Sequence, residues 1–213
     1  MISDSESALK VAEFLLKIKA VRLNPDNPFT WASGWKSPIY CDNRLTLSYP
    51  DVRTYLRQEF VNAIASKYTS LDAIVGVATG GIALGALVAE EMGLPFAYVR
   101  SAAKGHGMQN MIEGKLSAYD NVVVIEDLIS TGGSSLKAVS ALREAKVNVK
   151  GMFAIFTYGF AHSEEAFKEA EVELTTLSDF DTLLKEALRS DFITESQAEA
   201  IAPWRTSPDS WGK

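Results

Sequence analysis

Short hydrophobic runs alternate along this chain with longer amphipathic segments, an order typical of α/β proteins with a parallel sheet. The runs predict buried strands, at 72–77, 96–99, 122–125, 147–156 and 172–177. The amphipathic segments predict helices, at about 3–20, 50–67, 82–92, 136–145, 163–170 and 178–188. We therefore expect a central, mainly parallel sheet that is flanked by helices.

One predicted strand leads directly into the strongest candidate chemistry. Val122–Ile125 is a run of β-branched residues, which predicts a strand that is buried on both faces and ends before Glu126 and Asp127. The small residues at 131–134 then lead into a helix, whose first backbone N–H groups and positive dipole end favour an anion. Ligands of such sheets bind beyond the carboxyl ends of the strands. The pattern indicates a ligand with a phosphate at one end and hydroxyl groups or a metal beside it, such as a sugar phosphate.

Composition and charge narrow the class of protein. The chain has 213 residues, of which 47% are hydrophobic and 23% charged, and this suits one globular domain. Its net charge of −6 gives no overall basic surface for nucleic acid. Because Cys41 is the one cysteine, no intrachain disulfide can form, which favours a reducing compartment. That cysteine and two distant histidines give no metal-ligand spacing.

Other sequence signals are missing. The first residues lack the pattern of a signal peptide, and no apolar run is long enough for a membrane helix. Neither a G-x-G-x-x-G nor a G-x-x-x-x-G-K-[ST] motif occurs, which argues against dinucleotide and nucleoside-triphosphate binding. We expect a cytoplasmic protein that binds neither membrane nor nucleic acid.

Residues 126–134 resemble the phosphoribosyl-diphosphate (PRPP) motif of type I phosphoribosyltransferases, which has apolar residues, two acids and a Thr/Gly loop. The resemblance implies that the acids contact the ribose hydroxyls and that the loop holds the 5′-phosphate. The implied PRPP-binding residues here are Glu126, Asp127, Leu128, Ile129, Ser130, Thr131, Gly132, Gly133 and Ser134. The simpler alternative is an ordinary strand–loop–helix corner with a solvated Glu-Asp pair.

An aromatic segment near the N-terminus carries a second resemblance. Residues 29–44 predict two short strands joined at Ser33-Gly34, and they resemble the hood of orotate phosphoribosyltransferases, with its Ser-Gly-x-Lys-Ser-Pro-x-Tyr pattern. The resemblance implies orotate binding by Tyr40, Arg22 and Ser130. Without it, three aromatic rings in such a hairpin are more often simple packing.

Two further stretches match the same family. The turn at Thr79 and Gly80 stands where the family contacts the diphosphate; many relatives have a lysine in place of Gly80, so only backbone amides remain here. Arg100, Lys104 and His106 match a catalytic loop, and with Asp127 they are the implied catalytic residues. The glycines around these cations predict a mobile loop that closes over a site. A solvated surface loop is the alternative.

The organisation implied is one domain with a type I phosphoribosyltransferase fold. It comprises an N-terminal helix and small hood (1–45), the phosphoribosyltransferase core (46–190), and a C-terminal helix and tail (191–213). The tail has two tryptophans that are expected to be buried, against the body or a partner subunit, and it has no predicted catalytic role. One departure stands out: Thr157–Phe160 replaces an Asp-Arg pair with which many orotate enzymes contact the base.

The resemblance implies a pentosyl transfer in which PRPP and orotate give orotidine 5′-phosphate and diphosphate, a step of pyrimidine biosynthesis. It also implies Mg²⁺, held mainly by PRPP and water with Asp127 as a candidate protein ligand, and a homodimer whose mobile loops close over each other's active sites. The alternatives are a purine-type phosphoribosyltransferase, a PRPP-binding regulator without turnover, and a structural α/β protein.

Overall fold

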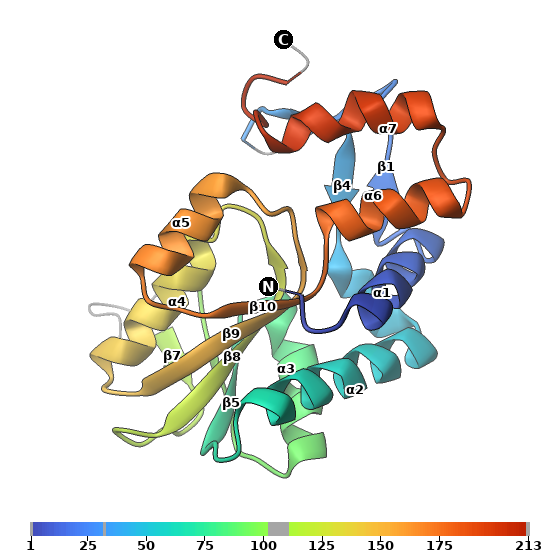
Figure 1. Ribbon diagram of the computed structural model, residues 1–213. Coiled ribbons are helices and arrows are strands. Elements are labelled where there is room, and N and C mark those ends of the chain that lie inside the picture. The colour runs from blue at the N-terminus through green and yellow to red at the C-terminus, as the bar shows by residue number, and fades with distance from the viewer. Residues whose placement is uncertain (1, 32, 102–110, 212–213) are drawn as a thin grey trace.

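The computed structural model describes residues 2–31, 33–101 and 111–211, which form an α/β fold around a mainly parallel sheet (Figure 1). The sheet order is β10-β9-β8-β5-β6-β7. Its strands are β5 (Ala73–Val77), β6 (Phe96–Val99), β7 (Ile112–Glu113), β8 (Asn121–Ile129), β9 (Asn148–Thr157) and β10 (Leu174–Asp179). Neighbouring strands run parallel except β7, which is antiparallel to β6. The predicted mainly parallel sheet is confirmed.

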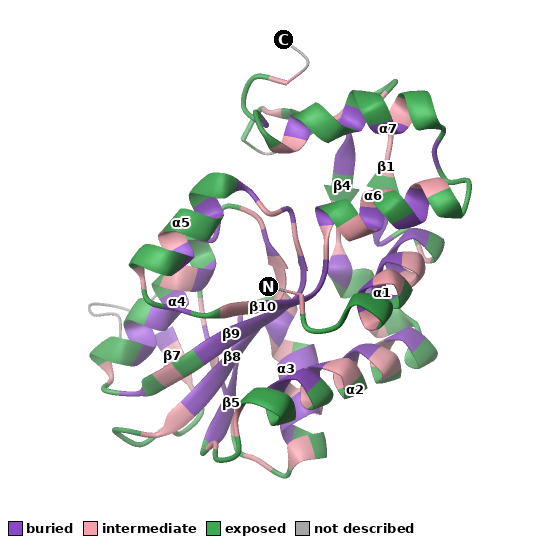
Figure 2. Ribbon diagram, viewed as in Figure 1, coloured by how far each residue is buried: buried purple, intermediate pink, exposed green. Residues whose placement is uncertain are grey.

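Helices cover both faces of this sheet (Figures 1 and 2). The helices α1 (Ser5–Lys17), α2 (Pro50–Lys67) and α3 (Gly80–Met92) share a core with Val123 and Ile125 of β8. On the opposite face, α4 (Gly133–Glu144) and α5 (Ala161–Glu169) pack with Val122 and Val124. Because successive residues of a strand point to opposite faces, this alternation explains why the whole run from 122 to 125 is apolar.

Two small antiparallel pairs lie beside the carboxyl ends of the main strands. In the hood, β2 (Phe29–Thr30) pairs with β3 (Lys36–Ser37), which confirms the predicted hairpin. The next strand, β4 (Ile39–Cys41), pairs with β1 (Val21–Leu23), followed by the 3₁₀ helix η1 (Asn43–Ser48). Strand β1, which contains Arg22, was not predicted from the sequence. A three-residue strand is too short for its alternation to be recognised.

The C-terminal elements pack against the N-terminal ones. In Figure 1, α6 (Phe180–Arg189) lies next to α1, and α7 (Glu195–Ile201) lies above β1 and β4. The following turn η3 (Ala202–Arg205) carries Trp204, which is completely buried. Trp211 packs against the same core and donates to the carbonyl of Ala200 (3.2 Å). The predicted burial against the body is confirmed for Trp204, whereas Trp211 is only partly buried. The division at residues 45 and 190 stays a prediction.

One predicted strand boundary needs correction, and a further strand was missed. Strand β8 does not end before Glu126 but runs to Ile129, because Glu126 and Leu128 continue the parallel register with β9. A buried, hydrogen-bonded carboxyl group is compatible with a strand, although an acidic residue alone suggests a strand end. Strand β7 was not predicted, and Met111 before it is buried although the stretch looks unlike core. None of the described helices has the length and apolar character needed to cross a membrane.

Candidate active site

Two adjoining cavities lie where the parallel strands end beneath the hood. The larger, of about 470 Å³, is lined by hood residues and by the start of the loop after β8. The smaller, of about 360 Å³, lies between the end of β8, the turn after β5 and the end of the hood. Cys41 and Leu128 line both, so the two cavities are neighbours. This is the edge at which open α/β sheets bind their ligands.

The smaller cavity brings together predicted PRPP-binding residues from one strand and from the starts of two helices. Glu126, Asp127 and Ser134 line it together with Thr79 and Gly80. The Ala78–Thr79 peptide bond is cis. Gly80 approaches Asp127 so closely that a Cβ atom at position 80 would overlap the Asp127 carboxyl group. In this chain the absence of a side chain at position 80 is therefore what leaves room for the Asp127 carboxylate.

The two adjacent acids differ in environment. Glu126 is buried, and its Oε1 accepts a hydrogen bond from the Asp127 backbone N–H (3.0 Å) while its Oε2 accepts one from the Ser135 hydroxyl (3.0 Å). Burial, with the neighbouring Asp127 carboxyl group, raises the pKa of Glu126 to about 9. Asp127 is only partly buried. Asp127 is thus the carboxylate that is open to a ligand, and the buried Glu126 holds the Asp127 backbone by a hydrogen bond.

The loop after β8 has the shape that the sequence predicted for an anion site. Gly132 caps α4 with a φ of +81°, and a Cβ atom there would also meet the Phe167 ring. The helix begins at Gly133, three residues before the predicted start, so its free N–H groups belong to the loop itself. Ser130 and Thr131 line the larger cavity. The loop therefore borders both cavities.

Leu128 and Ile129 take different positions. Leu128 lies between the two cavities, whereas the Ile129 side chain is buried in the core that packs on α4. The Ile129 carbonyl accepts hydrogen bonds from the Tyr158 backbone N–H (3.2 Å) and the Thr157 hydroxyl (3.2 Å). The Ile129 side chain is therefore not available to a ligand, and the Ile129 carbonyl links β8 to the end of β9.

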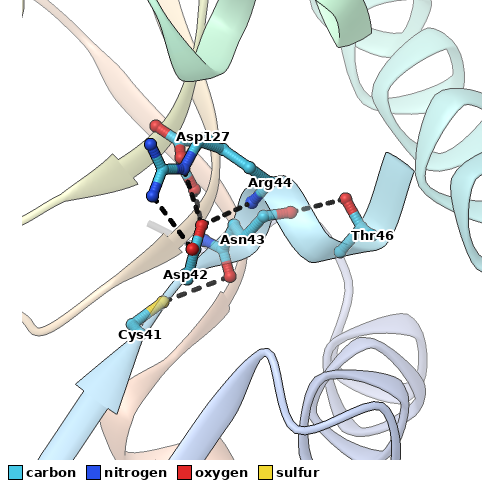
Figure 3. Close-up of polar contacts among 6 residues, drawn as sticks. All are labelled: Cys41, Asp42, Asn43, Arg44, Thr46 and Asp127. Carbon is cyan, nitrogen blue, oxygen red and sulfur yellow. Dashed lines mark hydrogen bonds and ion pairs between the residues drawn. The ribbon is translucent and has the colours of Figure 1, made fainter. Parts of the chain in front are cut away.

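A polar network at the end of the hood, which the sequence did not predict, reaches the acidic pair (Figure 3). The Asn43 Nδ2 donates to the backbone carbonyl of Asp127 (2.6 Å), and the Cys41 thiol donates to the Asn43 Oδ1 (3.2 Å). Asp42 and Arg44 form an ion pair (2.7 Å) whose side chains line the smaller cavity. The available signal was the polar run Asp42-Asn43-Arg44 after an apolar strand.

The larger cavity has aromatic walls. Trp31, Trp35 and Tyr40 from the hood line it, with Tyr158 from the end of β9. The Arg22 guanidinium lies over the Tyr40 ring, 4.9 Å from its centroid, and 5.3 Å from that of Phe29. Arg22 is not part of the lining, so the structure pairs it with Tyr40 and places only Tyr40 at the cavity. Walls of this kind suit a flat, partly apolar ligand.

Of the three cationic residues predicted for the catalytic loop, only Arg100 lies within the described residues. Arg100 donates to the Glu113 carboxylate (3.2 Å) across the β6–β7 pair, and its backbone N–H donates to the Met111 carbonyl (2.8 Å). It does not line either cavity. Lys104 and His106 lie outside the described residues. Of the two implied catalytic residues that the structure describes, Asp127 lines a cavity and Arg100 lines neither.

Comparison with known proteins agrees with this geometry. Residues 49–179 match the family of the phosphoribosyl transferase domain, and the chain belongs to that family. It is 54% identical over 202 residues to the orotate phosphoribosyltransferase of Porphyromonas gingivalis, covering 95% of this chain and 96% of that one. The orotate phosphoribosyltransferase of Phocaeicola vulgatus is 57% identical over 200 residues, or 94% of each chain.

A solved structure supports the same relationship. The crystal structure of orotate phosphoribosyltransferase from Aeropyrum pernix superposes with a TM-score of 0.70 at 26% identity, covering 83% of this chain and 98% of that one. The type I phosphoribosyltransferase fold that the sequence predicted is therefore confirmed.

Proposed function

We propose that this protein is an orotate phosphoribosyltransferase, which transfers the ribose 5-phosphate group of PRPP to orotate and gives orotidine 5′-phosphate and diphosphate. The observation that carries the proposal is the pairing of cavities: an aromatic one suited to a flat base adjoins one that contains Asp127 and borders the loop 130–134. The high identity to orotate phosphoribosyltransferases over almost the whole chain supports orotate as the base.

The smaller cavity and the loop would hold PRPP. The loop 130–134 would bind the 5′-phosphate through its N–H groups, and the turn at Thr79 and Gly80 would bind the diphosphate through its own. Asp127 would accept hydrogen bonds from the ribose hydroxyls, with Glu126 behind it. PRPP would then place its C1 near Leu128, one of the two residues shared by both cavities, and so present this carbon to a base in the larger cavity.

Displacement at C1 should pass through a state with positive charge on the ribose ring. The partly open Asp127 carboxylate would stabilise this charge, while the aromatic walls would orient the base nitrogen and exclude water. Arg100, Lys104 and His106 would neutralise the departing diphosphate. None of these steps requires a covalent intermediate with the protein.

Mg²⁺ is part of the proposal as a companion of PRPP. Among the described residues, no group of three or more His, Cys, Asp or Glu side chains could hold a metal ion. The oxygen atoms of Asp127 fit the preference of Mg²⁺, which retains several waters and is commonly bound through one or two carboxylates plus substrate phosphates. Bound with PRPP, the ion would offset the negative charge of the diphosphate.

We further propose a cytoplasmic homodimer with shared active sites. The free Cys41 fits a reducing compartment. In the described structure Arg100 is paired with Glu113 and does not line either cavity of its own subunit, which fits a loop that serves the site of a partner.

The test is to mix the protein with PRPP, Mg²⁺ and one base at a time, and to measure nucleotide and diphosphate. We expect orotate to give orotidine 5′-phosphate, with turnover well above that with uracil, hypoxanthine or adenine. Faster turnover with a purine would favour the purine-type alternative. PRPP binding without turnover of any base would indicate a non-catalytic regulator.

A further inference from the structure

The buried tyrosine at the end of β9 has a free polar group beside the proposed base position. Tyr158 lines the larger cavity, yet only 2% of its surface is exposed. Within the described part of the chain, its hydroxyl makes no hydrogen bond. The polar side-chain atoms that are fully buried without a partner there are the Arg57 Nε and the Trp204 Nε1, so the Tyr158 oxygen atom retains some exposure. The hydroxyl therefore faces the cavity.

Several other polar groups around this cavity already have partners. The Trp31 Nε1 donates to the Ile39 carbonyl (3.2 Å), the Thr30 hydroxyl accepts from the Lys36 ammonium (2.8 Å), and the Cys41 thiol donates to Asn43. Among the described residues that line the cavity, none is a lysine or arginine. An anionic base must therefore find neutral hydrogen-bond donors here, and the Tyr158 hydroxyl is a buried, unused one.

Aromatic packing fixes the direction of this hydroxyl. The Tyr158 ring contacts four other rings with centroid separations of 5.3 to 5.7 Å, from Trp31, Phe156, Phe160 and Trp204. A ring held on several sides loses little further freedom when a ligand binds, so its hydrogen bond is preorganised. Burial also raises the pKa of Tyr158 well above its usual range, which keeps the hydroxyl protonated and able to donate.

We propose that the Tyr158 hydroxyl donates a hydrogen bond to an oxygen atom of the bound pyrimidine, and that this contact contributes to the selection of orotate. The inference rests on the proposed function, because it takes the larger cavity as the base site. It assigns to Tyr158 a binding role, whereas Trp204 and Phe160 position its ring.

The decisive variant is Tyr158→Phe, which retains the ring packing and removes one oxygen atom. Steady-state kinetics with the full chain, varying orotate and PRPP separately, should show an orotate KM raised about tenfold, the loss expected for one hydrogen bond to a charged or strongly polar acceptor. The PRPP KM and kcat should stay within about threefold of wild type. Tyr68→Phe is the matched control, because its hydroxyl donates to the Lys150 carbonyl (3.0 Å) and Tyr68 does not line either cavity.

An unchanged orotate KM in Tyr158→Phe would overturn the proposal, as would an equal rise of both KM values, which would indicate a general disturbance of the site. Thermal unfolding identifies a variant that fails to fold. In that case the test is binding of the product, orotidine 5′-phosphate, to the folded fraction, and its affinity should be weakened by the same factor. Failure of the proposed function looks different, because wild type itself would then not convert orotate.

Discussion

Adding one methyl group at Gly80 should displace the carboxylate on which catalysis is proposed to depend. Gly80 is the first residue of α3 and needs no unusual φ, so alanine fits its backbone. The new Cβ atom would overlap the Asp127 carboxyl group, whereas carbon and oxygen atoms normally keep more than 3 Å apart. The carboxylate must therefore move by about 1 Å or more. A misplacement of that size can cost about 10²-fold in rate.

The effect of Gly80→Ala on stability should be small by comparison. Overpacking costs about 1–3 kcal/mol, and replacing glycine by alanine in a helix returns about 1 kcal/mol. The net loss is about 0–2 kcal/mol, which for a chain of this size lowers Tm by no more than about 8 °C. The assay is kcat with saturating orotate and PRPP at a temperature at which the variant is folded.

A double-mutant cycle with Asp127→Ala separates this mechanism from general damage. Once the carboxyl group is gone, Gly80→Ala should cost little further activity, because the methyl group enters the vacated space. The reasoning is refuted if Gly80→Ala alone retains wild-type kcat. It is equally refuted if the substitution costs the same factor with and without Asp127.

Three other predictions test the acids and the shared site. Asp127→Asn should lower turnover by about 10²-fold or more, whereas the control Asp51→Asn, at an exposed position, should not. A near wild-type kcat in Asp127→Asn would show that Asp127 is only a solvated acid. Mixing inactive Lys104→Ala and Asp127→Asn subunits should restore about a quarter of wild-type activity, since about half the dimers are mixed and each of these has one intact site; no recovery after exchange confirmed by mass spectrometry contradicts the shared site. Because the pKa of Glu126 is raised from 4.5 to about 9, the folded protein retains a proton that the unfolded chain releases, so stability falls as pH rises through that window. In Glu126→Gln, the free energy of unfolding measured with urea should fall less steeply between pH 5 and 8, by up to about 1.4 kcal/mol per pH unit. If the free energy of unfolding depends on pH as it does in wild type, Glu126 is not a buried protonated group.

The sequence predicted the main sheet well because its signals are local. The apolar run 122–125, the turn at Gly80 and the small residues at 131–134 can each be recognised within about ten residues. At these positions the structure has a strand, a turn into a helix and the start of another helix, although the exact boundaries differ. The smaller cavity could be predicted for the same reason, since its residues follow strands that end at one edge of the sheet.

What the sequence did not reveal depends on contacts between distant segments. Asn43 and Asp127 are 84 positions apart, and nothing local to either indicates that the amide of one binds the backbone of the other. The pairing of β1 with β4 is likewise a tertiary feature, because strands of three residues have little pattern of their own. Trp204 was expected to be buried, yet its position behind Tyr158 could come only from the folded chain.

The position of Trp204 has a consequence for how the protein is made. Its ring packs against Trp31 of the hood, Tyr158 directly after β9 and Phe180 of α6, so it lies behind a cavity wall to which segments from both halves of the chain contribute. A ribosome synthesises it after all of those partners. Domains fold as units during and after synthesis, and the sheet from β5 to β10 can assemble first. The nascent enzyme would then carry an unfinished base pocket with exposed aromatic rings until Trp204 emerges from the ribosome.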